Sequence, residues 1–330
     1  MPSLQNYHSF HLQAEAQQLE TFHDVPSALS LCRQYPQHYL LGEGSNTVFI
    51  ENYDGAVLLN RITGIEVSTS DTAVSLRVGA GENWHNLVTT ALAHGWHGME
   101  NLALIPGAVG ASPIQNIGAY GLEVADFITS VEMVELATGQ TQVLNNAECQ
   151  FGYRDSVFKQ ALLGKVIITH VNFCLPKTYS LNTRYGELKA LENPTPQSIY
   201  DEVIRVRRAK LPDPEITGNA GSFFKNPVIS ATAFGKLQAR YPDVPHYPVA
   251  DDNVKVPAAW LIDQAGYKGK QVGKVKCHIT QPLVLTNVGQ ASGPDVVLLA
   301  REIMDTVNTR FNVALEPEVR LVGKEGLVNL

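Results

Sequence analysis

Residues 105–121 read Ile-Pro-Gly-Ala-Val-Gly-Ala-Ser-Pro-Ile-Gln-Asn-Ile-Gly-Ala-Tyr-Gly, and this stretch decides how the fold is interpreted. Its prolines lack an amide hydrogen and its glycines weaken regular structure, so it is neither a regular helix nor a central strand. Glycine also lets the backbone approach a ligand closely. We therefore interpret the stretch as a loop that faces a ligand.

A second glycine-rich stretch, Gly-Glu-Gly-Ser-Asn at residues 42–46, lies between predicted strands at 38–41 and 47–50. Successive backbone N–H groups in such a stretch can cradle a phosphate. Taken alone, a glycine-rich turn is the better interpretation, and no helix follows to complete a Gly-x-Gly-x-x-Gly fingerprint. Together with residues 105–121 it gains weight, because two neutral backbone loops suit the ring and pyrophosphate of a flavin better than a metal ion.

Outside these loops, helices and strands are mixed without strict alternation, which favours the α+β class. Thr195 and Pro196 are typical of a helix start, as the cap and the first helical residue. An apolar stripe at 294–311 is typical of a helix packed on a core, and it consists of Val296, Leu299, Ala300, Ile303, Val307 and Phe311. The predicted helices are 25–33, 84–94, 196–209, 230–241, 257–265 and 294–311. The predicted strands are 38–41, 47–50, 57–60, 74–78 and 165–175, with a hairpin at 131–136 and 141–144.

The 330-residue chain is long enough for two or three domains. Its 44% hydrophobic and 17% charged residues are the balance of a packed globular protein. The net charge of -7 disfavours non-specific binding to nucleic acid, and the chain lacks a basic cluster for an anionic membrane surface. The polar start is not typical of a signal peptide, and no run nears the ~18 apolar residues of a membrane span. We expect a cytoplasmic monomer that binds neither nucleic acid nor a membrane.

The four cysteines, Cys32, Cys149, Cys174 and Cys277, are widely spaced and form no Cys-x-x-Cys pair. This spacing predicts reduced thiols rather than a disulfide framework or a zinc site. The histidines form no His-Glu-x-x-His motif. No metal is therefore expected.

Five motifs occur in one order along the chain. They are Leu-Gly-Glu-Gly-Ser-Asn at 41–46, the stretch at 105–121, Tyr-Arg-Asp-Ser at 153–156, Gly-Asn-Ala-Gly-Ser-Phe-Phe-Lys-Asn-Pro at 218–227, and Leu-Glu-Pro-Glu-Val-Arg at 315–320. In these motifs the chain closely resembles the UDP-N-acetylenolpyruvoylglucosamine reductase family (UDP-N-acetylmuramate dehydrogenases) of bacterial cell-wall synthesis. The likeness runs from residue 38 to residue 322, and the motif at 218–227 is very specific.

The resemblance implies a two-subdomain FAD-binding module of the vanillyl-alcohol oxidase type, followed by a C-terminal α+β substrate domain. We expect FAD-binding subdomains at 1–60 and 61–210 and the substrate domain at 211–330. The last residues are a candidate for a return to the first subdomain. The stretch at 179–191, which contains Tyr185, is similar to the subtype whose extra loop closes a tyrosine over the substrate.

The resemblance also implies a reaction, in which NADPH reduces a non-covalently bound FAD. The flavin N5 then passes hydride to the methylene carbon of UDP-N-acetylglucosamine enolpyruvate, which gives UDP-N-acetylmuramate for peptidoglycan synthesis. The two glycine-rich loops are the expected FAD site. Its predicted residues are Gly42, Gly44, Ser45, Asn46, Pro106, Gly107, Gly110, Ser112, Gly118, Tyr120 and Gly121.

Hydride addition leaves negative charge that spreads into the substrate carboxylate, so donors are needed there and an acid at the carbon. Arg154 has a planar guanidinium that matches a carboxylate in two parallel hydrogen bonds. An arginine seen in isolation is more often part of a salt bridge. Glu318 helps only if it is protonated or polarises another donor. The resemblance favours Glu318 over Glu316, and a glutamate paired with Arg320 is the alternative.

Ser222 is the predicted carbon acid. A serine hydroxyl is a very weak acid in water, but an adjacent enolate is basic enough to take its proton if the hydroxyl is held dry and aligned. A turn serine bonded to local backbone is the competing interpretation. The surrounding motif at 218–227 favours the acid.

The UDP group needs cations despite the negative net charge of the chain. Arg205, Arg207, Arg208 and Lys210 form a basic run at a helix end, much of which fits a solvated helix face. The predicted contacts to the diphosphate and uridine are Tyr185, Lys210, Asn226 and Gln281.

Two other functions stay open. One is an FAD oxidase of the same fold that acts on an alcohol or a sugar lactone; such enzymes often tether flavin through histidine or cysteine, and residues 42–46 contain neither. The other is a UDP-sugar-binding regulator without catalysis, against which the intact Arg154, Ser222 and Glu318 argue. A yellow colour would mark a flavoprotein. The compound that reoxidises the reduced flavin would separate a reductase from an oxidase.

Overall fold

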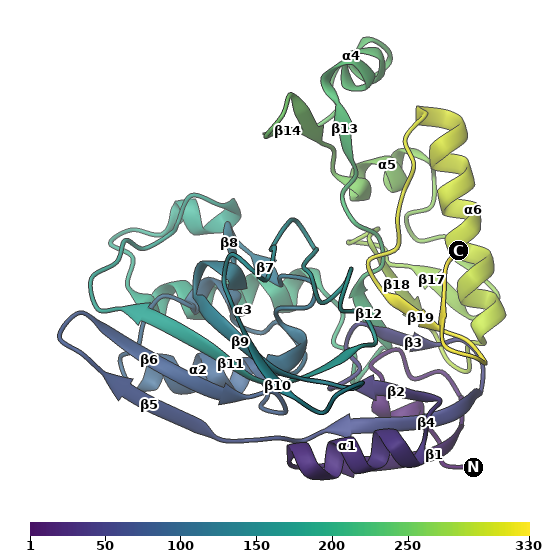
Figure 1. The fold of residues 1–330 in the computed structure, drawn as a ribbon. Helices are drawn as coiled ribbons and strands as arrows, with labels where there is room; N and C mark the ends of the chain where they lie inside the picture. Colours follow the sequence, from purple (N-terminus) through teal and green to yellow (C-terminus); the bar gives the residue numbers. More distant parts are fainter. The chain divides into compact units, whose positions relative to one another are not determined.

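The computed structural model describes residues 1–330, which form two compact units (Figure 1). Each unit is built from stretches that are separate in sequence. The central unit contains residues 17–43 and 55–209, and the C-terminal unit contains residues 1–16, 44–54 and 210–330. The three-part division expected from the sequence stays a prediction, because compactness alone does not define a folding subdomain.

A five-stranded antiparallel sheet forms the main layer of the central unit, with strand order β10-β9-β11-β6-β5. Its strands are β5 (Ile65–Thr69), β6 (Ala73–Gly79), β9 (Ile128–Glu135), β10 (Thr141–Asn145) and β11 (Val166–Pro176). Val74, Leu76 and Val78 alternate along β6 and are buried. They share one core with helices α2 (Trp84–Ala93) and α3 (Pro196–Lys210). The opposite face of β6 carries polar side chains, as expected for a half-buried strand.

A smaller sheet completes the central unit, with strand order β1-β4-β2. Its strands are β1 (Ala16–Phe22), β2 (His38–Leu41) and β4 (Tyr53–Asn60), and β2 runs parallel to β4. Helix α1 (Val25–Gln34) begins after Asp24, whose carboxylate accepts the Ser27 N–H at 2.8 Å as an N-cap. The helix buries Ala28 in a core with residues of both sheets.

The C-terminal unit is built on a four-stranded sheet with strand order β12-β18-β17-β16. Its strands are β12 (Asn219–Ser222), β16 (Gln271–Val272), β17 (Val275–Cys277) and β18 (Val284–Asn287). Helices α5 (Ala258–Gln264) and α6 (Gly293–Phe311) share its core. Ser292 and Asp295 form a capping box at the start of α6, and Asn312 ends it in the left-handed conformation.

Two smaller sheets belong to the same unit. One joins β13 (Val228–Ser230), β15 (Asn253–Lys255) and β14 (Tyr247–Val249) beside helix α4 (Ala231–Arg240). The other joins β20 (Leu327–Val328), β19 (Arg320–Val322) and β3 (Thr47–Phe49), with β19 parallel to β3. The end of the chain therefore pairs with the strand that directly follows residues 42–46.

The α+β class is confirmed, and so are the six predicted helices, which end within two residues of their expected bounds. All six residues of the predicted stripe on α6 are buried. The hairpin of β9 and β10 is also confirmed, with Val134 opposite Thr141. Strand β1, strand β5 and most of the short strands of the C-terminal unit were not predicted. None of the helices is both long enough and apolar enough to cross a membrane.

The stripe on α6 generates a stability prediction. Ile303 is fully buried in the core of the C-terminal unit, whereas Leu298 on the same helix is 51% exposed. We expect Ile303→Ala to lower the free energy of unfolding by about 2–5 kcal/mol, because it removes buried methyl groups and leaves a cavity. Leu298→Ala is the matched control and should change it by less than about 0.5 kcal/mol. Urea titration followed by far-UV circular dichroism measures both; equal losses would contradict the assigned faces.

Candidate active site

Two glycine-rich loops that are far apart in sequence lie together in the central unit. A Cβ atom at Gly42 would lie 3.2 Å from the Cβ of Ala108. Asn83 links the two loops: its backbone forms a β-bridge with Ala108, and its Nδ2 donates to both Glu43 carboxylate oxygens at 2.8 and 3.0 Å. The two loops that were predicted to share one ligand therefore lie against each other at Gly42, Glu43 and Ala108.

The second loop also runs along the start of helix α2. The Trp84 N–H donates to the Gly107 carbonyl at 2.9 Å, and the Gly110 N–H donates to the Ala80 carbonyl at 2.9 Å. Gly107 has φ 121°, which favours glycine. A Cβ at Gly110 would lie 2.5 Å from the Ala80 Cβ, so packing within the protein already requires glycine there. The Gly107 carbonyl and the Asn83 side chain, which accepts the Asn86 N–H at 2.8 Å, thus satisfy two of the N–H groups at the start of α2.

The other half of the first loop belongs to the C-terminal unit. Gly44 has φ 68°, and a Cβ there would lie 2.0 Å from the Tyr7 carbonyl oxygen. The Ser9 N–H donates to the Gly44 carbonyl at 3.2 Å, and the Ser9 hydroxyl donates to the Ser45 carbonyl at 3.3 Å. The N-terminal segment therefore packs tightly behind this loop and fixes its backbone.

Asn46 connects the loop to the end of the chain. Its Nδ2 donates to the Glu318 carbonyl at 3.2 Å, and its own carbonyl accepts the Arg320 N–H at 2.9 Å. The Glu318 N–H in turn donates to the Phe223 carbonyl at 2.7 Å. Three segments that carry predicted site residues thus meet through their backbones in one unit.

Ser222 is the last residue of β12 and precedes Phe223. Its strand pairs with β18 through an irregular register between Asn219 and Ser222, and such a bulge re-aims side chains. Ser222 is half-buried. Its hydroxyl has no hydrogen-bond partner in the chain, unlike the hydroxyls of Ser112 and Ser156, which donate to backbone carbonyls at 2.7 and 2.6 Å.

Glu316 and Glu318 lie in different surroundings. The Glu316 side chain is 73% exposed and pairs with Lys225 at 3.1 Å. Glu318 is half-buried, and its backbone is held at Phe223 and Asn46. Because Glu316 is largely exposed and already paired with a lysine, the choice of Glu318 as the site residue stays the better prediction.

Three predicted substrate contacts also belong to the C-terminal unit. The Asn226 Oδ1 accepts the Ala258 N–H at 2.9 Å, so this side chain supports the start of α5. Gln281 lies in the turn between β17 and β18, where its carbonyl accepts the Val284 N–H at 2.9 Å. Lys210 is exposed at the end of α3. Their contacts with a substrate stay predictions.

Arg154 lies in a tight turn of the central unit with φ 55°. A left-handed conformation is uncommon for arginine, and such strain is concentrated at functional sites. Its guanidinium donates to the carbonyls of Asn116 at 3.2 Å and Gly118 at 2.8 Å, and it lies 5.4 Å from the Tyr153 ring centre. The carboxylate-binding candidate is therefore anchored directly to the segment of residues 105–121.

The end of that segment forms a tight hairpin of β7 (Gly118–Ala119) and β8 (Leu122–Glu123). A Cβ at Gly118 would lie 2.7 Å from the Leu122 carbonyl oxygen. Tyr120 and Gly121 at its tip have φ 50° and 82°. Burial raises the pKa of the Tyr120 phenol, which therefore stays a neutral donor. Two further predicted residues lie earlier in the segment. Ser112 is buried and donates to the Val109 carbonyl, and Pro106 directly precedes Gly107.

The predicted tyrosine loop, residues 179–191, is held on this hairpin. The Asn182 Nδ2 donates to the Gly121 carbonyl at 3.1 Å, and the Asn101 Nδ2 donates to the carbonyls of Tyr120 and Asn182 at 3.0 and 2.8 Å. Tyr185 is 49% exposed and meets the Tyr120 ring edge-on at 6.3 Å. Sequence reasoning missed both asparagines, because no local pattern marks an amide that bridges two loops.

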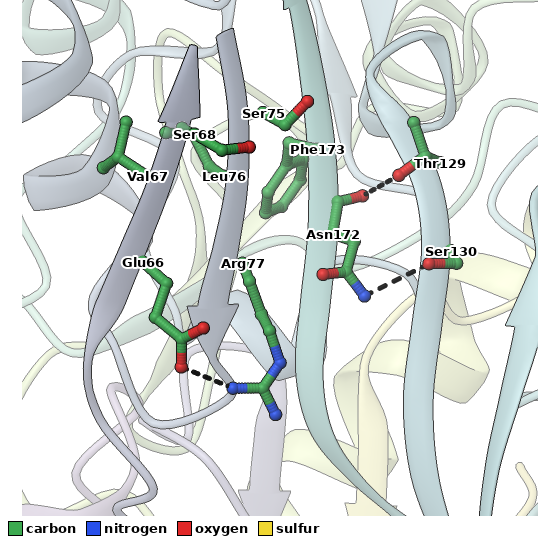
Figure 2. Close-up of a pocket in the computed structure, with 10 residues that line it drawn as sticks. All are labelled: Glu66, Val67, Ser68, Ser75, Leu76, Arg77, Thr129, Ser130, Asn172 and Phe173. Carbon is green, nitrogen blue, oxygen red and sulfur yellow. Dashed lines mark hydrogen bonds and ion pairs between the residues drawn. The ribbon is translucent and has the colours of Figure 1, made fainter.

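A polar groove of about 450 Å³ lies on the face of the five-stranded sheet that carries Ser75 and Arg77 (Figure 2). Arg77 pairs there with Glu66 and Glu132, both at 2.7 Å, and its hydrogen bond to Glu132 holds the pKa of that carboxyl below its usual range. Figure 2 also shows Asn172 reaching Ser130. None of the predicted site residues lines this groove, so it contributes nothing to the candidate site.

The predicted site residues thus form two groups. Ser222, Glu318 and Asn46 are linked through hydrogen bonds of the C-terminal unit, with Gly44 and Ser45 beside them. Arg154 is linked to residues 116–121 of the central unit, and the tyrosine loop rests on the same hairpin.

Comparisons with known proteins identify the class first. A family model described as FAD binding domain matches residues 17–145, and a model described as UDP-N-acetylenolpyruvoylglucosamine reductase, C-terminal domain, matches residues 213–322. The chain is therefore a flavin-dependent oxidoreductase in which an FAD-binding domain is joined to a second, C-terminal domain.

Relatives define the family more narrowly. A UDP-N-acetylenolpyruvoylglucosamine reductase of Pseudoalteromonas atlantica is 47% identical over 100% of this chain and 96% of its own. One of Escherichia coli is 46% identical over 99% and 97% of the two chains. The chain belongs to the UDP-N-acetylenolpyruvoylglucosamine reductase family. A crystal structure of the reductase named MurB from Thermus caldophilus has the same fold, with TM-score 0.68 at 24% identity and 97% coverage of both chains.

The segment behind Gly44 generates a pH prediction. His8 is 1% exposed, and burial lowers its pKa to about 4. In the unfolded chain its pKa is about 6.5. Between these values the unfolded state binds a proton that the folded state excludes, so stability should fall as pH drops from about 6.5 to 4, by about 3 kcal/mol for this group.

The variant His8→Gln should lose this part of the pH dependence, since glutamine does not titrate. Unfolding free energies at pH 7.5 and pH 4.5, compared between wild type and variant, measure the difference. An unchanged difference between the two pH values would show that His8 does not titrate as a buried group.

Proposed function

We propose that the protein reduces UDP-N-acetylglucosamine enolpyruvate to UDP-N-acetylmuramate, with NADPH as the reductant, in peptidoglycan precursor synthesis. One observation carries the proposal: residues 223–225, which follow the candidate acid, run against residues 316–318. The full-length identity with reductases of that name supports the substrate. A cytoplasmic monomer is part of the proposal, and the four free cysteines suit a reducing compartment.

FAD fits the converging backbone loops of the site. The residues that would hold it are Gly42, Gly44, Ser45, Asn46 and those of the segment 105–121. The close approach of Gly42 to Ala108 supports a pyrophosphate site lined by backbone. When bound without a covalent tether, FAD supplies the hydride that reaches the enolpyruvyl methylene carbon.

Arg154 would bind the substrate carboxylate, into which the negative charge spreads. Its guanidinium is already oriented by two backbone carbonyls, so little reorganisation is needed as charge develops. A guanidinium keeps its positive charge across the working pH range. Arg154 would therefore bind the dianionic enolate more strongly than the singly charged carboxylate of the bound substrate, which is the differential binding that accelerates a reaction.

Ser222 would give its hydroxyl proton to the carbon next to the carboxylate. Its half-buried position and unpaired hydroxyl support this role, because an internal partner would compete for the proton. Glu318 is held on the neighbouring segment. It would stabilise the negative charge at that carbon, either as a protonated donor or by polarising another group. Tyr185, Lys210, Asn226 and Gln281 would bind the diphosphate and uridine.

The variant Ser222→Ala tests the proposal by splitting the catalytic cycle. Reduction of FAD by NADPH needs no proton on the sugar carbon, so its rate should stay near that of wild type. Reoxidation by the enolpyruvyl sugar should slow on the order of 10²–10⁴-fold, because a positioned proton donor is lost. Rapid-mixing absorbance measures each half separately.

The variant Ser222→Cys should recover part of the rate, because a thiol is a stronger acid of similar shape. Ser75→Ala, on the polar face of β6, is the matched control and should leave both halves unchanged. If the flavin of Ser222→Ala is reoxidised at the wild-type rate, Ser222 is only a turn residue and the mechanism is contradicted.

A further inference from the structure

Asn116 occupies an unusual position in the segment of residues 105–121. It is 1% exposed and has φ 46°, a left-handed conformation that asparagine adopts more easily than most residues. A buried amide has to satisfy both its donor and its acceptor. The partners of Asn116 therefore show what the residue holds in place.

The Asn116 amide bonds both the turn that carries Arg154 and the residues at the end of the β7–β8 hairpin. Its Nδ2 donates to the Gly152 carbonyl at 3.0 Å and to a Glu123 carboxylate oxygen at 2.6 Å. Its Oδ1 accepts the Ala125 N–H at 3.1 Å. One side chain thus ties β8 and the residues after it to the segment that leads into Tyr-Arg-Asp-Ser.

Gly152 is the first residue of the turn that carries Arg154. Gly152 and Asp155 exchange two backbone hydrogen bonds, at 3.0 and 3.3 Å, and enclose Tyr153 and Arg154. Arg154 is left-handed in this turn, a strained conformation that lasts only where the surroundings hold it. The bond from Asn116 to Gly152 anchors the base of the strained turn.

Asn116 also meets the other end of Arg154. The Asn116 carbonyl accepts from the guanidinium at 3.2 Å, next to the bond that Gly118 accepts at 2.8 Å. The Asn116 side chain thus holds the backbone of the turn that carries Arg154. The Asn116 carbonyl holds the Arg154 guanidinium. A shift of Asn116 would move both ends of Arg154 together.

We propose that Asn116 is a positioning residue that presets Arg154 for the substrate carboxylate. This role rests on the proposed function of Arg154. The positioning role can be separated from an effect on folding, because a second bond joins the segments 105–121 and 152–156. In that bond the Ser156 hydroxyl donates to the Ile114 carbonyl at 2.6 Å. Loss of the Asn116 amide should therefore loosen the turn without detaching the segments.

The test uses Asn116→Gly in the full-length holoenzyme. Glycine keeps the left-handed backbone at no steric cost, so the variant removes only the side-chain bonds. Reduction of FAD by NADPH should keep the wild-type rate. Reoxidation by UDP-N-acetylglucosamine enolpyruvate should slow on the order of 10²-fold, as expected when a charged group is displaced by about 1 Å.

A second variant covers the case in which glycine unfolds the protein. Asn116→Asp keeps the size of the side chain and the acceptor for Ala125, but places an oxygen where Nδ2 donated to Gly152 and Glu123. It should show the same selective loss. Asn172→Ala is the matched control, because it removes amide bonds to Ser130 and Glu132, both 3.1 Å, on the groove face of the sheet (Figure 2). It should leave both rates unchanged.

A double-mutant cycle with Arg154→Gln separates positioning from a general effect. If Asn116 acts through Arg154, Asn116→Gly should slow reoxidation by less than about twofold in the Arg154→Gln background. Additive losses, or equal losses in both halves, would overturn the positioning role while the role of Arg154 stands. Wild-type reoxidation in Arg154→Gln alone would overturn that part of the proposed function and this inference with it.

Discussion

The hydrogen bond from the Glu318 N–H to the Phe223 carbonyl, 2.7 Å long, holds the C-terminal unit around its candidate acid. It joins the segment after β12 to the segment before β19, and Asn46 adds the loop after β2 by bonding the Glu318 carbonyl. Each partner lies far from the others in sequence, so the site exists only when the unit is folded. The junction therefore fixes the backbone next to Ser222 and at Glu318, with one side-chain bond from Asn46.

Close backbone approach is the second constraint, and it changes how the glycines are interpreted. Gly44 and Gly110 would collide with the protein itself if they carried a Cβ, at Tyr7 and Ala80. Their first role is therefore to let the loops pack closely against the rest of the protein. Asn116 also holds a part of the chain that has no regular secondary structure. Its side-chain amide bonds the first residue of the turn that carries Arg154.

The sequence predicted the parts of the fold that local pattern determines. Helix α6 has a stripe with helical period, and β9 and β10 are two strand-like segments joined around Gly139. It could not predict β12, because Asn-Ala-Gly-Ser has no β-branched residue and becomes a strand only by pairing with β18. The candidate site was found by motif. The anchoring of Arg154 by Asn116 and Gly118 was not, since nothing in an isolated stretch shows which carbonyl a distant guanidinium will meet.

The central claim is that a flavin reduced by NADPH delivers its electrons to a UDP-linked enolpyruvyl sugar. The most direct measurement is anaerobic: NADPH is added to the purified protein until the flavin absorbance near 450 nm is lost, and UDP-N-acetylglucosamine enolpyruvate is then added in slight excess. We expect the absorbance to return without oxygen and one UDP-N-acetylmuramate to form per flavin. A flavin that stays reduced with the sugar and recovers only when air is admitted would contradict the account and favour an oxidase.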